Sequence, residues 1–123
     1  MYLEMINLLD ALKKSDRSYD IEKIEKAYAY AEELHAGQFR QSGEPYISHP
    51  VAVAKIVMEL GLDTDSIIAA LLHDTVEDCS EKTSLDVISK MFGSEVSMLV
   101  DSLTKIIQVP KIFSSLSLVN NFL

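Results

Sequence analysis

From residue 67 to residue 78 the chain reads Ile-Ile-Ala-Ala-Leu-Leu-His-Asp-Thr-Val-Glu-Asp. Its first six residues would be apolar on every side of a helix, and such a helix belongs in the interior of a protein. Asp63 or Thr64 can cap its start, because a short side chain with an oxygen atom accepts a hydrogen bond from a free N–H of the first turn. The stretch therefore predicts a buried helix around which the rest of the chain packs.

Four ionisable side chains follow this apolar run, and helical spacing places position 73 over 77 and position 74 over 78. Burying carboxylates beside an apolar helix is costly unless a cation or hydrogen bonds compensate them. His73 and Asp74 could instead simply end a helix at the surface. However, His49 lies at the end of a loop that contains Gly43 and Pro45, and it can approach the pair in space. Two imidazoles and one carboxylate suit Mn²⁺, Fe²⁺ or Zn²⁺.

Glu77 and Asp78 match a second requirement of phosphate-ester hydrolysis. Such an enzyme needs a base or positioner for water and a way to handle charge on the leaving group. Helical periodicity brings Glu77 to the face of His73 and supports the proximity of Asp78 less firmly. The alternative is a solvated helix end that has no chemical role.

Apolar residues at helical spacing predict further helices on both sides of this stretch. We expect them at residues 2–12, 21–34, 50–60, 84–91 and 94–105. Gly37 is a plausible cap for the end of the second helix, and residues 38–48 form an ordered loop. No segment shows strand periodicity, so the predicted fold class is all-α. Residues 106–123 change in composition, and we expect an irregular or frayed terminus that packs on the core or on a partner.

Composition limits the partners and the compartment. The 123 residues are 48% hydrophobic, which suits one compact domain. The net charge of -8, with no run rich in Lys or Arg, excludes the electrostatic footprint of a nucleic-acid or membrane-surface protein. An acidic protein that acts on a phosphorylated small molecule needs a cation to offset charge repulsion. Cys79 is the only cysteine, and the first ten residues lack a basic leader, which fits the cytoplasm.

Three motifs narrow this interpretation. Residues 35–54 read HAGQFRQSGEPYISHPVAVA, residues 70–78 read ALLHDTVED, and residues 101–105 read DSLTK. They resemble the signatures H-x-G-Q-x-R-x-S-G-x-P-Y-x-x-H-P-x-x-V-A, L-L-H-D-x-V-E-D and D-G-V-T-K of the hydrolase domain of the RelA/SpoT family. The resemblance covers residues 21–105 and implies an all-α, HD-domain-like helical bundle that is incomplete at the C-terminus. It implies a partial HD-type hydrolase domain at 1–105 and a divergent tail at 106–123.

The resemblance also implies a reaction, a cofactor and a set of site residues. The implied reaction is hydrolysis of the alarmone (p)ppGpp to GDP or GTP and pyrophosphate with one Mn²⁺ ion. The implied Mn²⁺ ligands are His49, His73 and Asp74, and the implied catalytic acids are Glu77 and Asp78. The implied nucleotide contacts are Arg40 stacked on guanine, Gln41 where many relatives have Lys, Ser42 near the ribose, and Tyr46. We expect His35 to be a hydrogen-bonded structural residue outside the metal set.

In the family, the hydrolase domain continues with helices that supply a fourth ligand, an Asp, and we expect this chain to stop before them. Two alternatives to a hydrolase therefore remain open. The chain could be an inactive remnant or interaction module that pairs through exposed apolar surface with another chain, which could be a second copy of itself. It could also be an HD phosphohydrolase for other nucleotides or phosphodiesters, although the loop at residues 37–49 argues against this.

Overall fold

The computed structural model describes residues 1–112, and it describes side chains as far as Lys105. All of its regular elements within that part are helices, and an isolated bridge joins Phe39 to Pro45. The predicted all-α fold class is therefore confirmed. None of the described helices is both long and apolar enough to cross a bilayer. In chain order the helices are α1 (Leu3–Lys14), α2 (Ile21–Leu34), α3 (Ser48–Glu59), α4 (Thr64–Leu72), α5 (Thr75–Asp78), α6 (Leu85–Phe92) and α7 (Ser94–Ile112).

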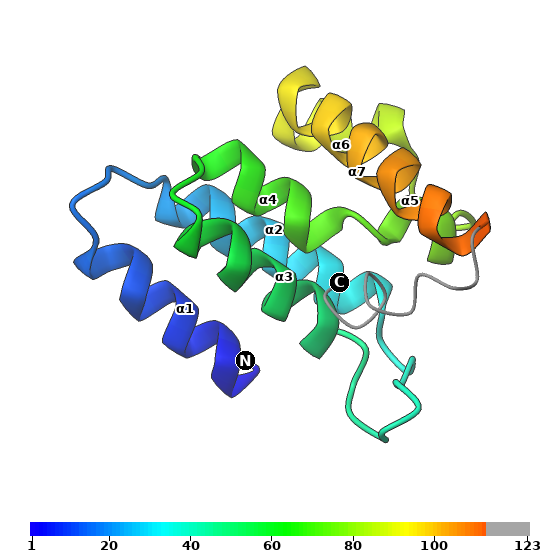
Figure 1. Ribbon diagram of the computed structural model, residues 1–123, viewed down its shortest axis with the longest axis horizontal. Coiled ribbons are helices and arrows are strands. Elements are labelled where there is room, and N and C mark those ends of the chain that lie inside the picture. Colours follow the sequence, from blue (N-terminus) through cyan, green and yellow to red (C-terminus); the bar gives the residue numbers. More distant parts are fainter. Residues whose placement is uncertain (113–123) are drawn as a thin grey trace.

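Helix α4 is the centre of the molecule. The six residues from Ile67 to Leu72 are completely buried, as their apolar character predicts. Helices α2, α3 and α7 all pack against α4, while α1 covers α2 and α3 on the side away from α6 and α7 (Figure 1). The end of α4 is therefore surrounded by the rest of the fold, and any polar group there has to find its partners inside the protein.

The start of α4 carries the predicted cap. Asp63 has extended backbone geometry, and its carboxylate accepts hydrogen bonds from the backbone N–H of Ser66 at 3.0 Å and from the Ser66 hydroxyl at 2.7 Å. These two bonds from Ser66 lower the pKa of Asp63, because they favour the charged carboxylate. Of the two candidate caps, the structure selects Asp63.

The end of the core helix differs from the prediction. The sequence predicts helical spacing from position 73 to position 78, whereas α4 ends at Leu72 and the short α5 begins at Thr75. The reason is competition from side chains, because the Thr75 hydroxyl donates to the Leu72 carbonyl at 2.7 Å. Helical spacing is kept from Asp74 to Asp78, whose backbone N–H donates to the Asp74 carbonyl at 2.9 Å.

Two other helix boundaries are also corrected. Helix α3 begins at Ser48, so His49 lies inside its first turn and not just before it. Helix α7 continues through Lys105 to Ile112, whereas the sequence predicts an irregular segment from residue 106. The change of composition at 106 brings no glycine or proline before Pro110, so nothing there stops a helix. The expectation for residues 113–123 lies outside the described part of the chain.

The cap of α4 gives a prediction about stability. Replacing Asp63 by Ala should lower the free energy of unfolding by about 1 kcal/mol, because the first turn of α4 loses its acceptor. Asp63→Asn keeps an acceptor oxygen and should stay close to wild type. Urea unfolding at pH 7, followed by circular dichroism, measures both variants. Equal stability of Asp63→Ala and wild type would show that the cap contributes nothing.

The same cap should depend on pH in a defined direction. The folded-state pKa of Asp63 is lowered, so the unfolded chain binds the proton more readily than the folded chain. The contribution of the charged cap is therefore complete well above the ordinary aspartate pKa of about 3.9. It is lost as the pH falls through the lower folded-state pKa.

Candidate metal centre

Three side chains from separate parts of the sequence meet where α4 ends. His49 comes from the first turn of α3, and His73 and Asp74 form the break between α4 and α5. One ligand atom from each of the three lies within 4.8 Å of the others, and the two imidazole ring centres are 5.4 Å apart. The structure thus brings together the three residues that the sequence predicts as metal ligands.

His73 is the most deeply buried of the three, with 1% of its side chain exposed. Its Nδ1 lies 2.6 Å from the Ala70 carbonyl oxygen. A carbonyl only accepts, so Nδ1 carries the proton and Nε2 can present a lone pair to the site. That Nε2 atom is buried and has no hydrogen-bond partner. A buried orphan nitrogen of this kind, held by a backbone carbonyl through the other ring nitrogen, is the usual arrangement of a histidine metal ligand.

The Asp74 carboxylate completes the cluster by facing both imidazoles. One oxygen, Oδ1, lies 3.1 Å from His73 Nε2, and the other, Oδ2, lies 3.4 Å from His49 Nε2. Two ligand atoms that are each about 2.1 Å from one ion stand about 3.0 to 3.4 Å apart at tetrahedral or octahedral angles. The spacing of the donor atoms therefore fits a divalent metal ion.

The surroundings of His49 favour its neutral imidazole, which is the form that binds metal. Burial lowers the pKa of its imidazole below the ordinary value, and the charge of Asp74 opposes this shift. His73 and Arg40 lower the pKa of His49 further. Because only neutral imidazole offers a lone pair to a metal, these surroundings favour ligation at neutral pH.

Tyr46 has a role at the cluster that its sequence position did not reveal. Its hydroxyl donates a hydrogen bond to Asp74 Oδ2 at 2.7 Å, and its ring centre lies 5.9 Å from that of His49. Burial and the neighbouring Asp74 raise the pKa of Tyr46, and Asp78 adds to the effect. The hydroxyl therefore stays protonated and orients the carboxylate. No local pattern signals this contact, because it joins residues 28 positions apart.

The acidic pair lies on α5, next to the cluster along the chain. Both Glu77 and Asp78 are exposed, so their carboxylates can meet water or a ligand. The backbone N–H of Asp78 donates to the Asp74 carbonyl at 2.9 Å, so Asp78 lies one helical turn from a residue of the cluster. The catalytic roles of the pair stay predictions.

The loop before α3 forms a tight turn that presents the predicted nucleotide contacts. The Arg40 backbone N–H donates to the Glu44 carbonyl at 2.8 Å, and the Gly43 N–H donates to the Arg40 carbonyl at 2.9 Å. Gly43 has a φ of +92°, which favours glycine. Arg40, Gln41 and Ser42 are all exposed, and their roles toward a nucleotide stay predictions.

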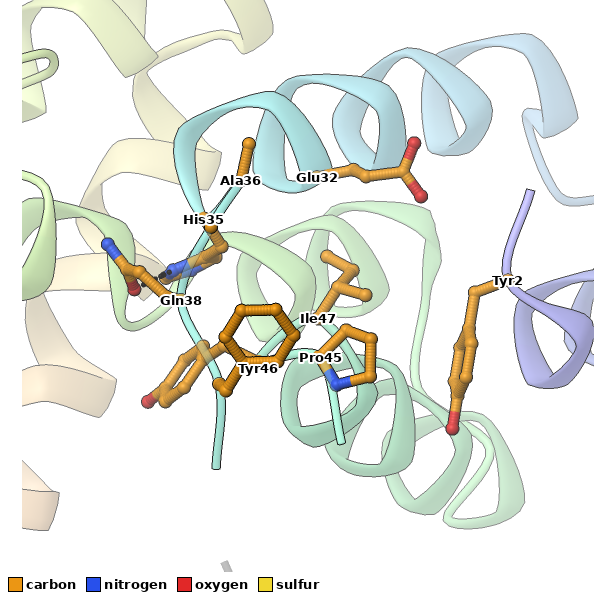
Figure 2. A pocket seen from close by; sticks show the side chains of 10 residues that line it. Tyr2, Glu32, His35, Ala36, Gln38, Pro45, Tyr46 and Ile47 are labelled. Atoms are coloured by element: carbon orange, nitrogen blue, oxygen red, sulfur yellow. Dashed lines mark hydrogen bonds between the residues drawn. The ribbon is translucent and has the colours of Figure 1, made fainter. Parts of the chain in front are cut away.

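His35 lies beside the site but outside the metal cluster. It is buried, and its Nδ1 lies 3.0 Å from Gln38 Oε1, so the expectation of a hydrogen-bonded residue holds. Its ring centre is 4.6 Å from that of Tyr46. Figure 2 shows both side chains at a largely apolar cavity of about 400 Å³. His49, His73 and Asp74 are not among the described residues that line this cavity.

Residues 27–119 match the HD domain family. The chain belongs to this family. The match extends beyond Lys105, where the resemblance found in the sequence ends. In the HD domain the His73-Asp74 pair is the adjacent His and Asp of the ALLHDTVED motif.

Relatives of this HD domain confirm the resemblance to the RelA/SpoT family. It is 51% identical over 85 residues to a guanosine-3′,5′-bis(diphosphate) 3′-pyrophosphohydrolase of Aquifex aeolicus, covering 69% of this chain and 12% of that protein. It is 47% identical over 104 residues to a Vibrio cholerae protein of the same name, and the alignment covers 80% of this chain and 14% of that protein. A bifunctional (p)ppGpp synthase/hydrolase RelA of Mycobacterium tuberculosis is 59% identical over 59 residues, which are 48% of this chain and 8% of that protein. The chain therefore spans a small part of the length of these curated relatives.

Metal binding should stabilise the folded HD domain. Because the cluster exists only in the folded state, Mn²⁺ at 100 times its dissociation constant should add about 2.7 kcal/mol to the free energy of unfolding. Asp74→Asn should weaken Mn²⁺ binding by more than about 100-fold, since even residues outside the ligand set typically change affinity 10–100-fold. Isothermal titration calorimetry and thermal melts with and without EDTA measure both effects.

Two variants serve as matched controls for this experiment. Asp101→Asn removes a partly exposed carboxylate whose ion pair, among the described side chains, is with the exposed Lys105. His35→Gln removes the buried imidazole that lies outside the cluster. Asp101→Asn should bind Mn²⁺ with the affinity of wild type. His35→Gln, whose native ring packs against Tyr46 at 4.6 Å, should weaken binding less than Asp74→Asn does. If Asp74→Asn also bound normally, the cluster would not be the metal site.

Proposed function

We propose that this HD domain hydrolyses (p)ppGpp in a reaction that depends on a divalent metal ion, for which we propose Mn²⁺. The products would be GDP or GTP and pyrophosphate. The observation that carries the proposal is the cluster of His49, His73 and Asp74, in which a buried Nε2 without a partner faces a carboxylate. The names of the Aquifex aeolicus and Vibrio cholerae relatives support the choice of substrate.

The residues that would hold the ion are the two imidazoles and Asp74. When bound, a divalent ion supplies a lowered pKa for water and positive charge against the phosphates. Tyr46 supports this by keeping the Asp74 carboxylate in one orientation through its 2.7 Å hydrogen bond. The acidic chain needs such a charge, because its own net charge of -8 repels a nucleotide that carries two pyrophosphate groups.

We assign the proton transfers to the acidic pair on α5. In the proposed reaction a water oxygen bonds to the phosphorus that is attached to the 3′ oxygen, and the bond between that phosphorus and the 3′ oxygen breaks. Glu77 and Asp78 would orient the water, accept its proton and return a proton to the departing 3′ oxygen. Their exposure on a helix beside the cluster suits both steps.

The turn before α3 would bind the guanine nucleotide. A guanidinium group combines stacking on a base with attraction to phosphate, so Arg40 is the proposed contact to guanine. Arg40 is exposed, and its ion pair with Glu44 is long at 3.9 Å, so the guanidinium group is available to a ligand. Gln41, Ser42 and Tyr46 would complete this part of the nucleotide site.

Several relatives are named GTP pyrophosphokinase, which describes synthesis rather than hydrolysis. This chain covers only 11% of each of those two proteins. We assign hydrolysis to the part represented here, because the metal cluster lies inside the matched HD domain. Pairing of this chain with a second copy stays a prediction.

A direct assay tests the proposal. The purified full chain, incubated with ppGpp and Mn²⁺, should release pyrophosphate and GDP, both quantified by ion-exchange chromatography. Glu77→Gln and Asp78→Asn should each lower kcat by about 10²–10⁴-fold, since each removes a proton-transfer group. Both variants should keep the Mn²⁺ affinity of wild type. A metal-loaded wild-type chain that leaves ppGpp intact would overturn the proposed function.

A further inference from the structure

The motif at residues 101–105 has no part in the site described so far. Its Thr104 lies on α7, and the hydroxyl oxygen stands 3.2 Å from the carbonyl oxygen of His73. We propose that Thr104 is a positioning residue, which holds the backbone between His73 and Asp74 in the geometry that binds metal. This inference rests on the proposed metal-dependent function.

The first step concerns the carbonyl groups at the end of α4. A helix leaves its last carbonyls without partners from the helix itself, and here that end is buried. Three carbonyls at this end accept hydrogen bonds from side chains. The Ala70 carbonyl accepts from His73 Nδ1 at 2.6 Å, and the Leu72 carbonyl accepts from the Thr75 hydroxyl at 2.7 Å. The His73 carbonyl accepts from the Thr104 hydroxyl. The helix thus ends through side chains and not through a glycine cap.

The second step is that Thr104 differs from the other two donors. His73 and Thr75 each bond a carbonyl three residues away, so they shape the break locally. Thr104 reaches across 31 residues from another helix. It therefore fixes the break relative to α7, which packs along α4.

The third step links this bond to the ligands. The His73 carbonyl belongs to the peptide group that joins His73 to Asp74. Holding its oxygen fixes ψ of His73 at -31° and φ of Asp74 at -89°. These two angles determine how the imidazole and the carboxylate face each other, so the hydroxyl acts on both ligands at once.

Thr104 also makes a bond that carries no such role. Its hydroxyl lies 2.9 Å from the Val100 carbonyl of its own helix, so the single proton is shared between two acceptors. Ser102 makes the same kind of bond alone, from its hydroxyl to the Met98 carbonyl at 3.0 Å, on the exposed side of α7. Ser102→Ala is therefore a matched control that removes only a bond within the helix.

The test compares Mn²⁺ affinity in the full-length variants by isothermal titration calorimetry. Thr104→Val keeps the shape of the side chain but loses the hydroxyl, and it should weaken Mn²⁺ binding about 10–100-fold. Thr104→Ala, with its high helix propensity, is the second variant should the Val variant fail to fold. Thr104→Ser keeps the hydroxyl, so its Mn²⁺ affinity should stay within about threefold of wild type. Ser102→Ala should leave it unchanged. Unchanged affinity in folded Thr104→Val or Thr104→Ala overturns the proposal.

A measurement on the metal-free chain separates this inference from the proposed function. The Nδ1 proton of His73, donated to Ala70, is detected by NMR, and its exchange with water should be faster in Thr104→Val than in Ser102→Ala. Equal exchange in the two variants overturns the role of Thr104. A wild-type chain that binds no Mn²⁺ overturns the proposed function instead, and the exchange comparison still decides the claim about Thr104.

Discussion

The structure depends on one constraint, which is the burial of His73 at the end of a helix that is apolar on all sides. The ring cannot turn toward water, because 1% of its side chain is exposed and one of its nitrogen atoms is held by Ala70. The other nitrogen faces the Asp74 carboxylate without a hydrogen bond. We propose that a cation completes this site, because the nitrogen is left unpaired beside a carboxylate.

Helices α3 and α7 and the turn before α3 each supply a group that acts on His73 or on the neighbouring Asp74. Helix α3 brings a second imidazole, His49, and its preceding turn brings the Tyr46 hydroxyl, which fixes the carboxylate. Helix α7 contributes the hydroxyl of Thr104 to the backbone of the ligand pair. Helix α3, the turn before it and helix α7 thus all contribute side chains around two adjacent residues. The proposed catalytic acids follow on α5, so they lie in the same short segment as the proposed ligands His73 and Asp74.

Much of this arrangement is predictable from the sequence, and each failure has its own physical cause. The apolar run at 67–72 predicts the core helix, and the residues before it predict its cap, because both signals are local. The break after Leu72 is not predicted, because hydroxyl and imidazole donors compete with the helix only once they are placed in space. The long-range hydrogen bonds of Tyr46 and Thr104 leave no periodic signal in the sequence. The continuation of α7 past residue 105 shows that a change in composition alone does not end a helix.

The most direct test of the central claim is the identity of the atoms that bind the ion. Pulsed electron paramagnetic resonance of the Mn²⁺-loaded full chain, prepared with ¹⁵N-labelled histidine, detects nitrogen atoms bonded to manganese. The account predicts couplings to two imidazole nitrogens in wild type and to one in His49→Gln. Manganese without any histidine coupling would contradict it, because the buried nitrogen of His73 would then have no metal to bind.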